Sequence, residues 1–577
     1  NIHMSTRFLQ LRQNYPEKNI LDLITLTTEK MFWPILYTAL TTIIAFLSLI
    51  FSEIKPIIDF GWMMTLGLIT SFIITFTLLP TLINFVPEGN ISLDKNNESK
   101  ITSFFSKISQ NNHPKNLGSP LTSKDITTDF AEALVELVTP TFESPKELFE
   151  HLTLLHKFLY SHMGEEILWN FSMPCAFQSE QEIKIAEYGE SNSGMLKHIY
   201  RKGLRLRYGS IMQCVSGIHY NFSLSKDSWN SLCDNPDQKF INNKYLETIR
   251  NIKRNFWFVL ERLGASPIAH GSYLLNRKHS LAKHGQNDLF LPNATSLRMS
   301  DVGYQSNVQN ALKINYNNLD EFIDAVIKGI KTPVENFEDI GLHDKHGVPQ
   351  QISTGILQIE NELYDTVRPK RSGPSGSRPA TLLKNEGIEY LELRGIDINP
   401  FIPEGIDENK IKLLDIFIMH SLISKSPQVS EEEIEEIRTN QKTMVENGRS
   451  KDIKLKQNGI SVPLAELKKS FHEELTQVAT AMDEYCPGYS NALSAEMSVN
   501  VMPSEKIMNE MESQNLSFQE YGLIQSKKIA MKQTSSADED FLKFIHNAEK
   551  SIKDLKNLNE NPGIDINKYV ELYNSKI

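Results

Sequence analysis

The sequence predicts an α+β protein preceded by a two-helix membrane hairpin. Two uncharged runs near the beginning, residues 31–51 and 60–85, are long enough to cross a bilayer. After them, short β-like runs alternate with amphipathic helical patterns up to about residue 410, and helical patterns dominate beyond it. This order indicates a sheet with helices appended to it.

The two uncharged runs are separated by a polar turn at residues 52–59 that contains a proline. Lys and Arg residues precede the first run and follow the second, whereas the turn carries only Lys55. Positive charge marks the cytoplasmic side of a membrane segment. We therefore expect an inner-membrane tether, with everything after residue 95 in the cytoplasm.

The remaining composition is that of a globular protein with more than one domain, because 577 residues exceed a single hydrophobic core. The net charge of −11 argues against general nucleic-acid binding. The four cysteines are scattered without a CxxC pair, which excludes a cysteine-type zinc site and is typical of a reducing cytosol. Asn1 is not an initiator Met, so we expect the chain to begin inside a longer reading frame.

The body follows a polar linker at residues 86–125. Residues 144–163 predict a helix, with Ser144 as N-cap and Pro145 at the first helical position. Apolar alternation begins at Ile126. Further strand-like runs are expected at residues 211–224, 293–298 and 388–398.

The last third of the chain is predicted to be helical. One helix begins at the cap Ser430, has acids in its first turn and ends at Gly448. Another amphipathic helix covers residues 464–485. The residues past 530 are strongly charged, and we expect them to be peripheral.

Three strand-like runs carry acidic or imidazole groups where a core would want Val or Leu: ITTDFAEALVELVTP, SGIHYNFS and GIEYLELRGIDINP. The groups are Asp129, Glu132, Glu136, His219, Glu389 and Glu392. A carboxylate is rarely buried without a partner, so several together suggest a shared cation, and oxygen ligands with one imidazole favour Mg²⁺ or Mn²⁺. The alternative is carboxylates paired with Lys or Arg on a solvated sheet face.

The apolar segments TALTTIIAFLSLIF and FGWMMTLGLITSFIITFTLLPTLINF, followed by ITSFFSKISQN, resemble part of an RND/MMPL-type membrane exporter. Such exporters have about a dozen spans and acids inside the membrane that relay protons. The two spans here lack those acids. The resemblance therefore implies an exporter-like fragment and not a working pump.

From about residue 112 the chain resembles the proteobacterial glutamate–cysteine ligases. The motifs that carry the likeness are LWNFSMPC, YRKGLRLRYG, MQCVSGIHYNFSL, ATSLRMSDVGY, LQIENELYDTVRPKR and GIEYLELRGIDINPF. The resemblance implies a glutamine-synthetase-like fold, an antiparallel sheet bent into a funnel with helices around it. It also implies ATP-dependent joining of glutamate to cysteine, the first step of glutathione biosynthesis, by a monomeric ligase part that uses ATP and Mg²⁺ (or Mn²⁺).

The resemblance also implies a set of site residues. The positions that match metal ligands are Asp129, Glu136, His219 and Glu392. The positions that match the cysteine site are Tyr200, Leu204, Gln213, Arg298, Tyr304 and Tyr364.

Two further roles are expected close to Glu392. Arg394 lies two residues after it on the same strand face, where it could meet the transferring phosphoryl group or simply pair with Glu392. The basic run Arg368, Lys370 and Arg371 leads into a Ser/Gly/Pro loop, which could bind the nucleotide or be a plain solvated loop.

One departure separates this chain from the ligases it resembles. They open with a strand that carries two glutamates in a run like G[IL]E[RK]E, and residues 86–115 contain no such run. We therefore predict a hairpin at 1–95, a linker and fusion seam at 96–125, a catalytic domain at 126–430 and a helical part at 431–577. Three hypotheses remain open: an active membrane-tethered ligase, a catalytically impaired fusion or pseudogene product, and a transporter fragment.

Overall fold

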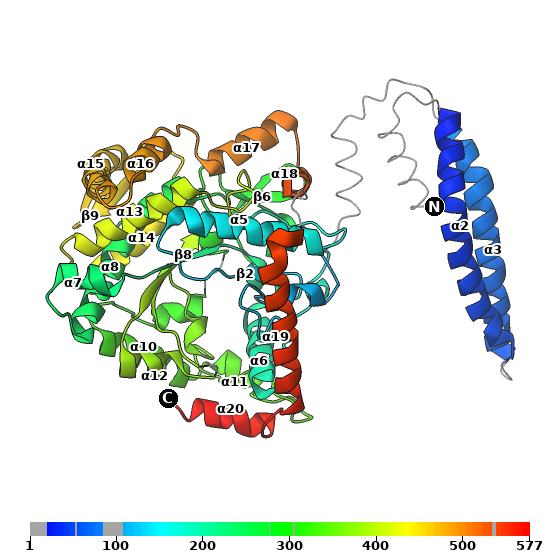
Figure 1. Cartoon of the computed structure of the whole chain (residues 1–577), viewed down its shortest axis with the longest axis horizontal. Helices are drawn as coiled ribbons and strands as arrows, with labels where there is room; N and C mark the ends of the chain where they lie inside the picture. Colours follow the sequence, from blue (N-terminus) through cyan, green and yellow to red (C-terminus); the bar gives the residue numbers. More distant parts are fainter. Residues whose placement is uncertain are drawn as a thin grey trace. The chain divides into compact units, whose positions relative to one another are not determined.

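Figure 1 shows the computed structural model, in which the chain divides into two units, residues 1–97 and residues 98–577. The structure describes residues 20–51, 55–84, 108–275, 277–303, 306–374, 376–533 and 538–577.

The first unit is a helical hairpin. Helix α2 (Ile20–Leu47) continues into the 3-10 turn η1 (Ser48–Phe51), and α3 (Lys55–Asn84) returns beside it. The ring centroids of Phe32 and Phe76 lie 5.2 Å apart, and those of Phe46 and Phe60 lie 6.0 Å apart, so the helices are antiparallel. The predicted pair of helices is confirmed, although both begin before the predicted runs.

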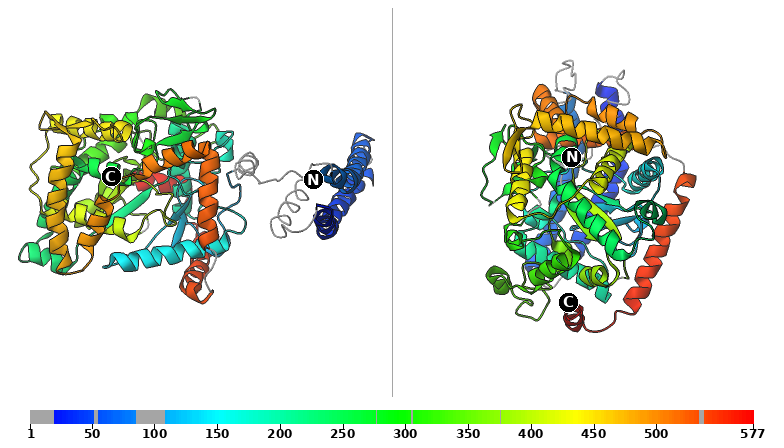
Figure 2. Two further views of the ribbon diagram at one scale, coloured as in Figure 1. Left: turned by 90° about the horizontal axis from the view of Figure 1, so that it is seen from above. Right: turned by 90° about the vertical axis from the view of Figure 1, so that its left-hand side faces the viewer.

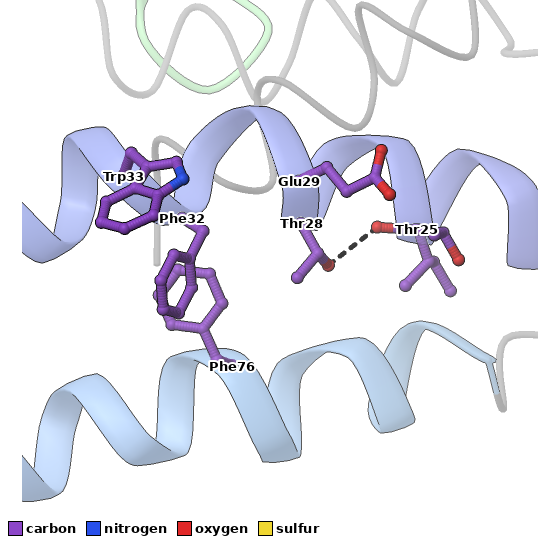
Figure 3. Close-up of a pocket in the computed structure, with 7 residues that line it drawn as sticks. Thr25, Thr28, Glu29, Phe32, Trp33 and Phe76 are labelled. Carbon is purple, nitrogen blue, oxygen red and sulfur yellow. Dashed lines mark hydrogen bonds between the residues drawn. The ribbon is translucent and has the colours of Figure 1, made fainter.

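Both hairpin helices are long and apolar enough to cross a membrane by length and composition, over Asp22–Leu47 and Ile58–Thr77. Large apolar side chains cover their outer faces, and Trp33, Ile44 and Met63 are each more than half exposed. A shallow groove of about 620 Å³ lies between the helices (Figure 3). The Thr28 hydroxyl in its lining donates a hydrogen bond to the Ile24 carbonyl of the same helix. The residues that line the groove do not form a group of side chains suited to catalysis.

The second unit is built around a three-stranded antiparallel sheet in the order β3 (Ile218–Phe222), β8 (Tyr390–Ile396), β7 (Val367–Lys370). One face of this sheet is apolar and packs into the main core with α8 (Gln238–Arg254), α9 (Phe256–Leu263) and α13 (Glu408–Ile423). The other face carries polar side chains, because successive strand residues point to opposite sides.

The other strands form small antiparallel pairs and ladders. They are the hairpin β1 (Ile126–Thr128) with β2 (Val135–Leu137), the sheet β4 (Ile268–His270), β6 (Asp288–Phe290) and β5 (Ala282–His284), and the hairpin β9 (Lys454–Gln457) with β10 (Ile460–Pro463). Antiparallel sheets with many helices around them confirm the α+β class.

The remaining helices surround these sheets (Figures 1 and 2). They are α5 (Pro145–His162), α6 (Asn192–Tyr208), α7 (Lys226–Leu232), α10 (Leu319–Lys331), α11 (Glu335–Ile340), α12 (Pro379–Glu386), α14 (Glu431–Asn447), α15 (Leu464–Asp483), α16 (Tyr489–Met497), α17 (Pro503–Gln514), α18 (Phe518–Gln533), α19 (Leu542–Glu560) and α20 (Ile566–Asn574). The 3-10 turns of this unit are η2 (Lys115–Leu117), η3 (Glu180–Glu182), η4 (Ile211–Cys214), η5 (Gly271–Leu274), η6 (Leu297–Met299), η7 (Asn307–Ala311), η8 (Glu360–Glu362) and η9 (Asp538–Phe541). The main core runs from Trp229 to Leu493, so it crosses residue 430 without a break.

Several predicted helix ends are confirmed. The Ser144 hydroxyl accepts the N–H of Glu147 at the start of α5, and the Ser430 hydroxyl accepts the N–H of Glu433 at the start of α14. The strand predicted at 293–298 is wrong, because the Ser296 side chain caps η6 and turns the chain there. The run at 211–224 becomes strand only at Ile218, since η4 occupies its first residues.

The helices past residue 530 lie on the outside of the unit, as predicted, but buried side chains anchor them to it. Phe541 and Phe544 are 2% exposed and pack against Leu155 and Phe158 in a separate core cluster. Helix α19 lies along the outside of the unit in Figure 1, next to the beginning of the ligase-like body. The charged residues cover its solvent side, while a narrow apolar stripe holds it in place.

Candidate active site

Glu392 lies at the centre of the polar sheet face, on the middle strand β8. Its register partners are Arg368 on β7 and Asn221 on β3. The Arg368 Nε and Nη2 atoms donate to the same carboxylate oxygen at 3.1 and 2.7 Å, and the Arg394 Nη1 atom donates to it at 2.9 Å. The Lys370 Nζ atom lies 3.9 Å from the other oxygen. Three cations from two strands therefore converge on one carboxylate.

These cations control the ionisation of Glu392. Burial alone would raise the pKa of this carboxyl, but the charges of Arg368, Lys370 and Arg394 lower it well below its usual range. The carboxylate is therefore ionised at every physiological pH. Burial and the charge of Arg368 lower the pKa of Lys370 to about 8, so this amine is still mostly charged near neutrality.

His219 lies beside Glu392 on the edge strand β3, with its Nδ1 atom 4.0 Å from the carboxylate. Burial, followed by the charge of Arg394, lowers the pKa of His219 well below its ordinary value, so the ring is neutral at pH 7. Its side chain is nevertheless 33% exposed. The ring therefore lies partly open to water on the polar face of the sheet.

The β1–β2 hairpin brings Asp129 and Glu136 toward this surface. Thr127 pairs with Glu136, and the Asp129 N–H donates to the Leu134 carbonyl, so the turn between the strands places both acids on one face. Burial and then the nearby Asp129 charge raise the pKa of Glu136 to about 7, although Arg201 and Arg394 act in the opposite direction. The interaction with Arg394 links the hairpin acids to the Glu392 cluster.

Arg298 is held rigidly at the side of the sheet. It is 5% exposed, and its Nη2 atom donates to the Arg394 carbonyl at 2.9 Å. Its Nη1 atom lies 3.7 Å from the Asp397 carboxylate. The guanidinium packs directly on Gly217, where an added Cβ atom would lie 2.1 Å from Nη2. Gly217 is therefore needed for this close approach.

The other residues predicted for the cysteine site lie partly together. Gln213 is buried, and its Nε2 atom donates to the Tyr364 hydroxyl at 3.4 Å. Tyr200 and Leu204 are one turn apart on α6; Leu204 is buried in the core, and the Tyr200 carbonyl accepts a bond from Gln358. Tyr304 lies outside the described residues. Arg371 contacts the Gly387 carbonyl at 3.4 Å and lies 3.3 Å from Glu386, on the rim of β7.

Two acids in the sequence-derived set have structural roles. The buried Glu132 carboxylate accepts the backbone N–H groups of His113 and Glu187, each at 2.7 Å. The exposed Glu389 carboxylate accepts the N–H of Ser372 at 2.8 Å. Both are satisfied by the backbone, so neither joins a shared cation site.

Sequence reasoning missed two cations on α6. The Arg201 Nε atom donates to the Asp129 carbonyl, and its guanidinium lies 4.5 Å from the ring centroid of Tyr188. Lys197, one turn earlier, lies 5.2 Å from the same ring. Burial, then the charge of Arg201, lowers the pKa of Lys197 to about 8, while Glu136 acts against this shift. Lys197 and Arg201 are four residues apart in the sequence around Tyr200, which places them on one face of a helix. This spacing is the sequence signal from which the pair could have been predicted.

Comparison with known proteins now decides the family. The family model described as glutamate-cysteine ligase matches residues 91–444, more than half of the chain. The chain belongs to the glutamate–cysteine ligase family. A second model, described as the MMPL family, matches residues 27–111. The two matches overlap at residues 91–111, close to the seam predicted for this ligase.

Two curated glutamate–cysteine ligases illustrate the likeness. The enzyme of Pseudomonas putida KT2440 is 38% identical over 484 residues, which are 82% of this chain and 92% of the relative. That of Pseudomonas entomophila is 40% identical over 432 residues, which are 73% of this chain and 81% of the relative. The predicted resemblance is confirmed.

Solved structures agree with this assignment. A glutamate–cysteine ligase from Francisella tularensis, solved in complex with AMP, superposes with a TM-score of 0.76 at 31% identity and covers 81% of this chain and 94% of its own. A bifunctional glutathione synthetase from Pasteurella multocida shares the fold, with a TM-score of 0.59 at 23% identity, 76% coverage of this chain and 53% of its own.

The predicted metal set is not gathered into one cluster in this ligase. Among the described residues, no three His, Cys, Asp or Glu side chains lie close enough together to hold an ion. Glu392 faces arginines, and Asp129 with Glu136 forms a separate pair. Two oxygen-bearing acids nonetheless fit Mg²⁺, which proteins commonly bind through one or two carboxylates together with substrate phosphates.

Proposed function

We propose that this chain joins the γ-carboxylate of glutamate to the amine of cysteine at the expense of ATP, through a γ-glutamyl phosphate, as the first step of glutathione biosynthesis. The observation that carries the proposal is the charge balance on the polar sheet face. Arg368, Lys370 and Arg394 surround the single negative charge of Glu392. This concentration of positive charge around one carboxylate, next to the partly open His219 ring, suits the phosphate groups of ATP.

The chemistry explains why such a site is needed. A carboxylate oxygen is a poor leaving group, so ATP first phosphorylates the γ-carboxylate and the cysteine amine then displaces phosphate. Phosphoryl transfer depends on positioning and on neutralising negative charge. Arg394 and Lys370 supply cations to the phosphoryl oxygens, and Glu392 holds both of them in place. In this scheme Arg394 acts catalytically and Glu392 fixes its direction.

Magnesium is part of the proposal. Asp129 and Glu136 would hold the ion together with phosphate oxygens, and the bound ion would neutralise phosphate charge during the transfer. Burial and the charge of Asp129 raise the pKa of Glu136, and a cation bound beside the two acids would favour their charged forms. His219 remains a proposed ligand, because its ring is neutral and its side chain is partly open to water.

The amino-acid side of the site rests on Arg298, Tyr200, Gln213 and Tyr364. Arg298 presents a planar guanidinium that can pair with a substrate carboxylate through two hydrogen bonds. Gln213 and Tyr364 contact each other and offer polar groups to the cysteine. Arg371, at the rim of β7, is proposed to contact the nucleotide.

We also propose that α2 and α3 tether the ligase to the inner membrane, with residues after 95 in the cytoplasm. The outward apolar side chains and the lengths of both helices support this role. Two spans leave no room for a transport pathway, which disfavours the transporter alternative. Flotation with liposomes tests the tether, and a variant without residues 1–97 provides the control.

Release of ADP tests the catalytic proposal. The purified full chain should form ADP only when glutamate, cysteine and Mg²⁺ are all present. Formation of ADP that ignores cysteine would contradict the proposed reaction. Binding of AMP without any ADP formation would instead identify a folded but catalytically impaired ligase.

A further inference from the structure

Helix α20 (labelled in Figure 1) packs against α6, the helix that carries Tyr200 and Leu204. Tyr573 on this helix is 6% exposed and packs against Ile199 of α6 and Ile352 in a small core cluster that Tyr200 also touches. Its ring also covers Arg378, whose guanidinium carbon lies 4.3 Å from the ring centroid. One aromatic side chain therefore contacts both the cysteine-side helix and the residue that begins α12.

Arg378 transmits this contact to the 3-10 turn η8. Its side chain is fully buried, and it meets the Glu360 carboxylate through Nε at 3.1 Å and through Nη2 at 3.0 Å. A buried ion pair is stable only when its remaining surfaces are shielded and well packed. The Tyr573 ring provides that shield, because its π face attracts the guanidinium while excluding water.

The turn η8 in turn supports the cations of the site. Asn361 is the residue after Glu360. Its carbonyl accepts a hydrogen bond from the Arg368 Nη1 atom at 3.0 Å. Its side-chain oxygen accepts a hydrogen bond from the Lys370 Nζ atom at 3.4 Å. A small cavity lined by Glu360, Asn361, Arg368 and Lys370 lies at the same place. A continuous line of contacts thus leads from Tyr573 to the cations beside Glu392.

We propose that Tyr573 is a positioning residue for the phosphate side of the reaction, acting through Arg378, Glu360 and Asn361 on Arg368 and Lys370. Only the predicted effect on enzyme kinetics depends on the proposed ligase function. Loss of the ring would expose the ion pair between Arg378 and Glu360 to water and loosen η8. The side chains of Arg368 and Lys370 would then occupy a wider range of positions. Binding of ATP would then weaken more than binding of either amino acid.

The test uses the full chain in detergent with three variants. Tyr573→Ala should raise the KM for ATP by roughly fivefold and change the KM for glutamate and cysteine by less than about twofold. Tyr573→Phe keeps the ring and should restore the wild-type KM for ATP. Tyr485→Ala, at a tyrosine that is 91% exposed, is the matched control and should have no effect. Equal rises for all three substrates would overturn the proposal.

Two further measurements separate this inference from the function itself. Calorimetry with AMP should show weaker binding by Tyr573→Ala, and amide hydrogen exchange should become faster in residues 360–370. If the wild type forms no ADP, the ligase proposal fails, and these two measurements still decide the positioning role. Unchanged exchange in residues 360–370 of Tyr573→Ala would overturn it.

Discussion

Glu392 and Arg368 face each other in register across β8 and β7, and the Nε and Nη2 atoms of the guanidinium donate to one carboxylate oxygen. This pair, 8% and 5% exposed, forms the centre of the cation cluster. The cluster is both a structural ion network and the best candidate for phosphate binding. The two roles predict different responses to mutation.

Glu392→Gln should lower kcat/KM for ADP formation by roughly a hundredfold, because the cations lose their fixed orientation. It should also destabilise the fold by about 3 kcal/mol, since the buried Arg368 and the partly buried Lys370 and Arg394 lose their counter-ion. The lowered pKa of Glu392 means that its stabilisation is present above the unfolded pKa and is lost only when pH falls through the folded one. The difference in Tm from wild type should therefore be constant from about pH 5 to 8. Glu389→Gln is the control, and near-normal kcat in Glu392→Gln would show that the site lies elsewhere.

Glu136→Gln should have the opposite effect on stability. The folded pKa of Glu136 is raised to about 7 by burial and by Asp129, so wild-type stability decreases as pH rises from about 4.5 to 7. The variant lacks this cost and should melt higher than wild type at about pH 8 but equally at about pH 4. Mg²⁺ with ATP should raise the Tm of wild type more than that of the variant. An unchanged Tm profile, with the exposed Glu143→Gln as reference, would contradict this environment for Glu136.

Arg298→Lys should weaken cysteine binding more than ATP binding, because lysine keeps the charge but loses the planar fork. Gly217→Ala should reproduce this effect without changing any charged group, since its Cβ atom would push the Arg298 guanidinium away. Steady-state kinetics with each substrate varied in turn checks both variants. Equal losses for ATP, glutamate and cysteine would indicate a folding defect.

Removal of residues 1–97 should leave a soluble protein with the specific activity of the full chain. The chain divides into two units between residues 97 and 98, and the described residues of the hairpin include no side chains suited to ligase chemistry. Removal of residues 1–113 should instead lower the Tm, because Glu132 loses the N–H of His113. Activity assays in detergent compare all three proteins. A fall in activity on removing residues 1–97 would mean that the hairpin contributes to the ligase.

Replacing residues 1–107 with a family-type opening strand that bears two glutamates should raise activity by roughly tenfold. ATP brings about four negative charges, and the ions that hold them need more carboxylates than Asp129 and Glu136 supply. Among the described strands, β3 pairs only with β8, so its outer edge offers a place for the added strand. If the native chain already works at the repaired rate, other residues supply the missing ligands.

Sequence patterns predicted those structural features that depend on residues close together in the chain, such as helix caps. Ser144 and Ser430 cap the helices that the sequence predicted. The partner of a buried acid could not be predicted in the same way. Glu132 and Glu392 both lie in apolar runs, but one binds backbone N–H groups and the other binds arginines. That difference is decided by tertiary contacts over long sequence separations, which no local pattern contains.

The contact between α19 and the start of the ligase unit has a consequence for the order of events during synthesis. The N–H of Ser119 donates to the Ser551 hydroxyl at 2.9 Å, and Asp125 accepts a bond from Asn547. These partners are separated by more than 400 residues. Contacts between such distant residues form only after the later segment has left the ribosome. Under the proposed membrane tether, the hairpin emerges before α19 and would insert before the enzyme is complete, so each ligase would mature at the membrane surface.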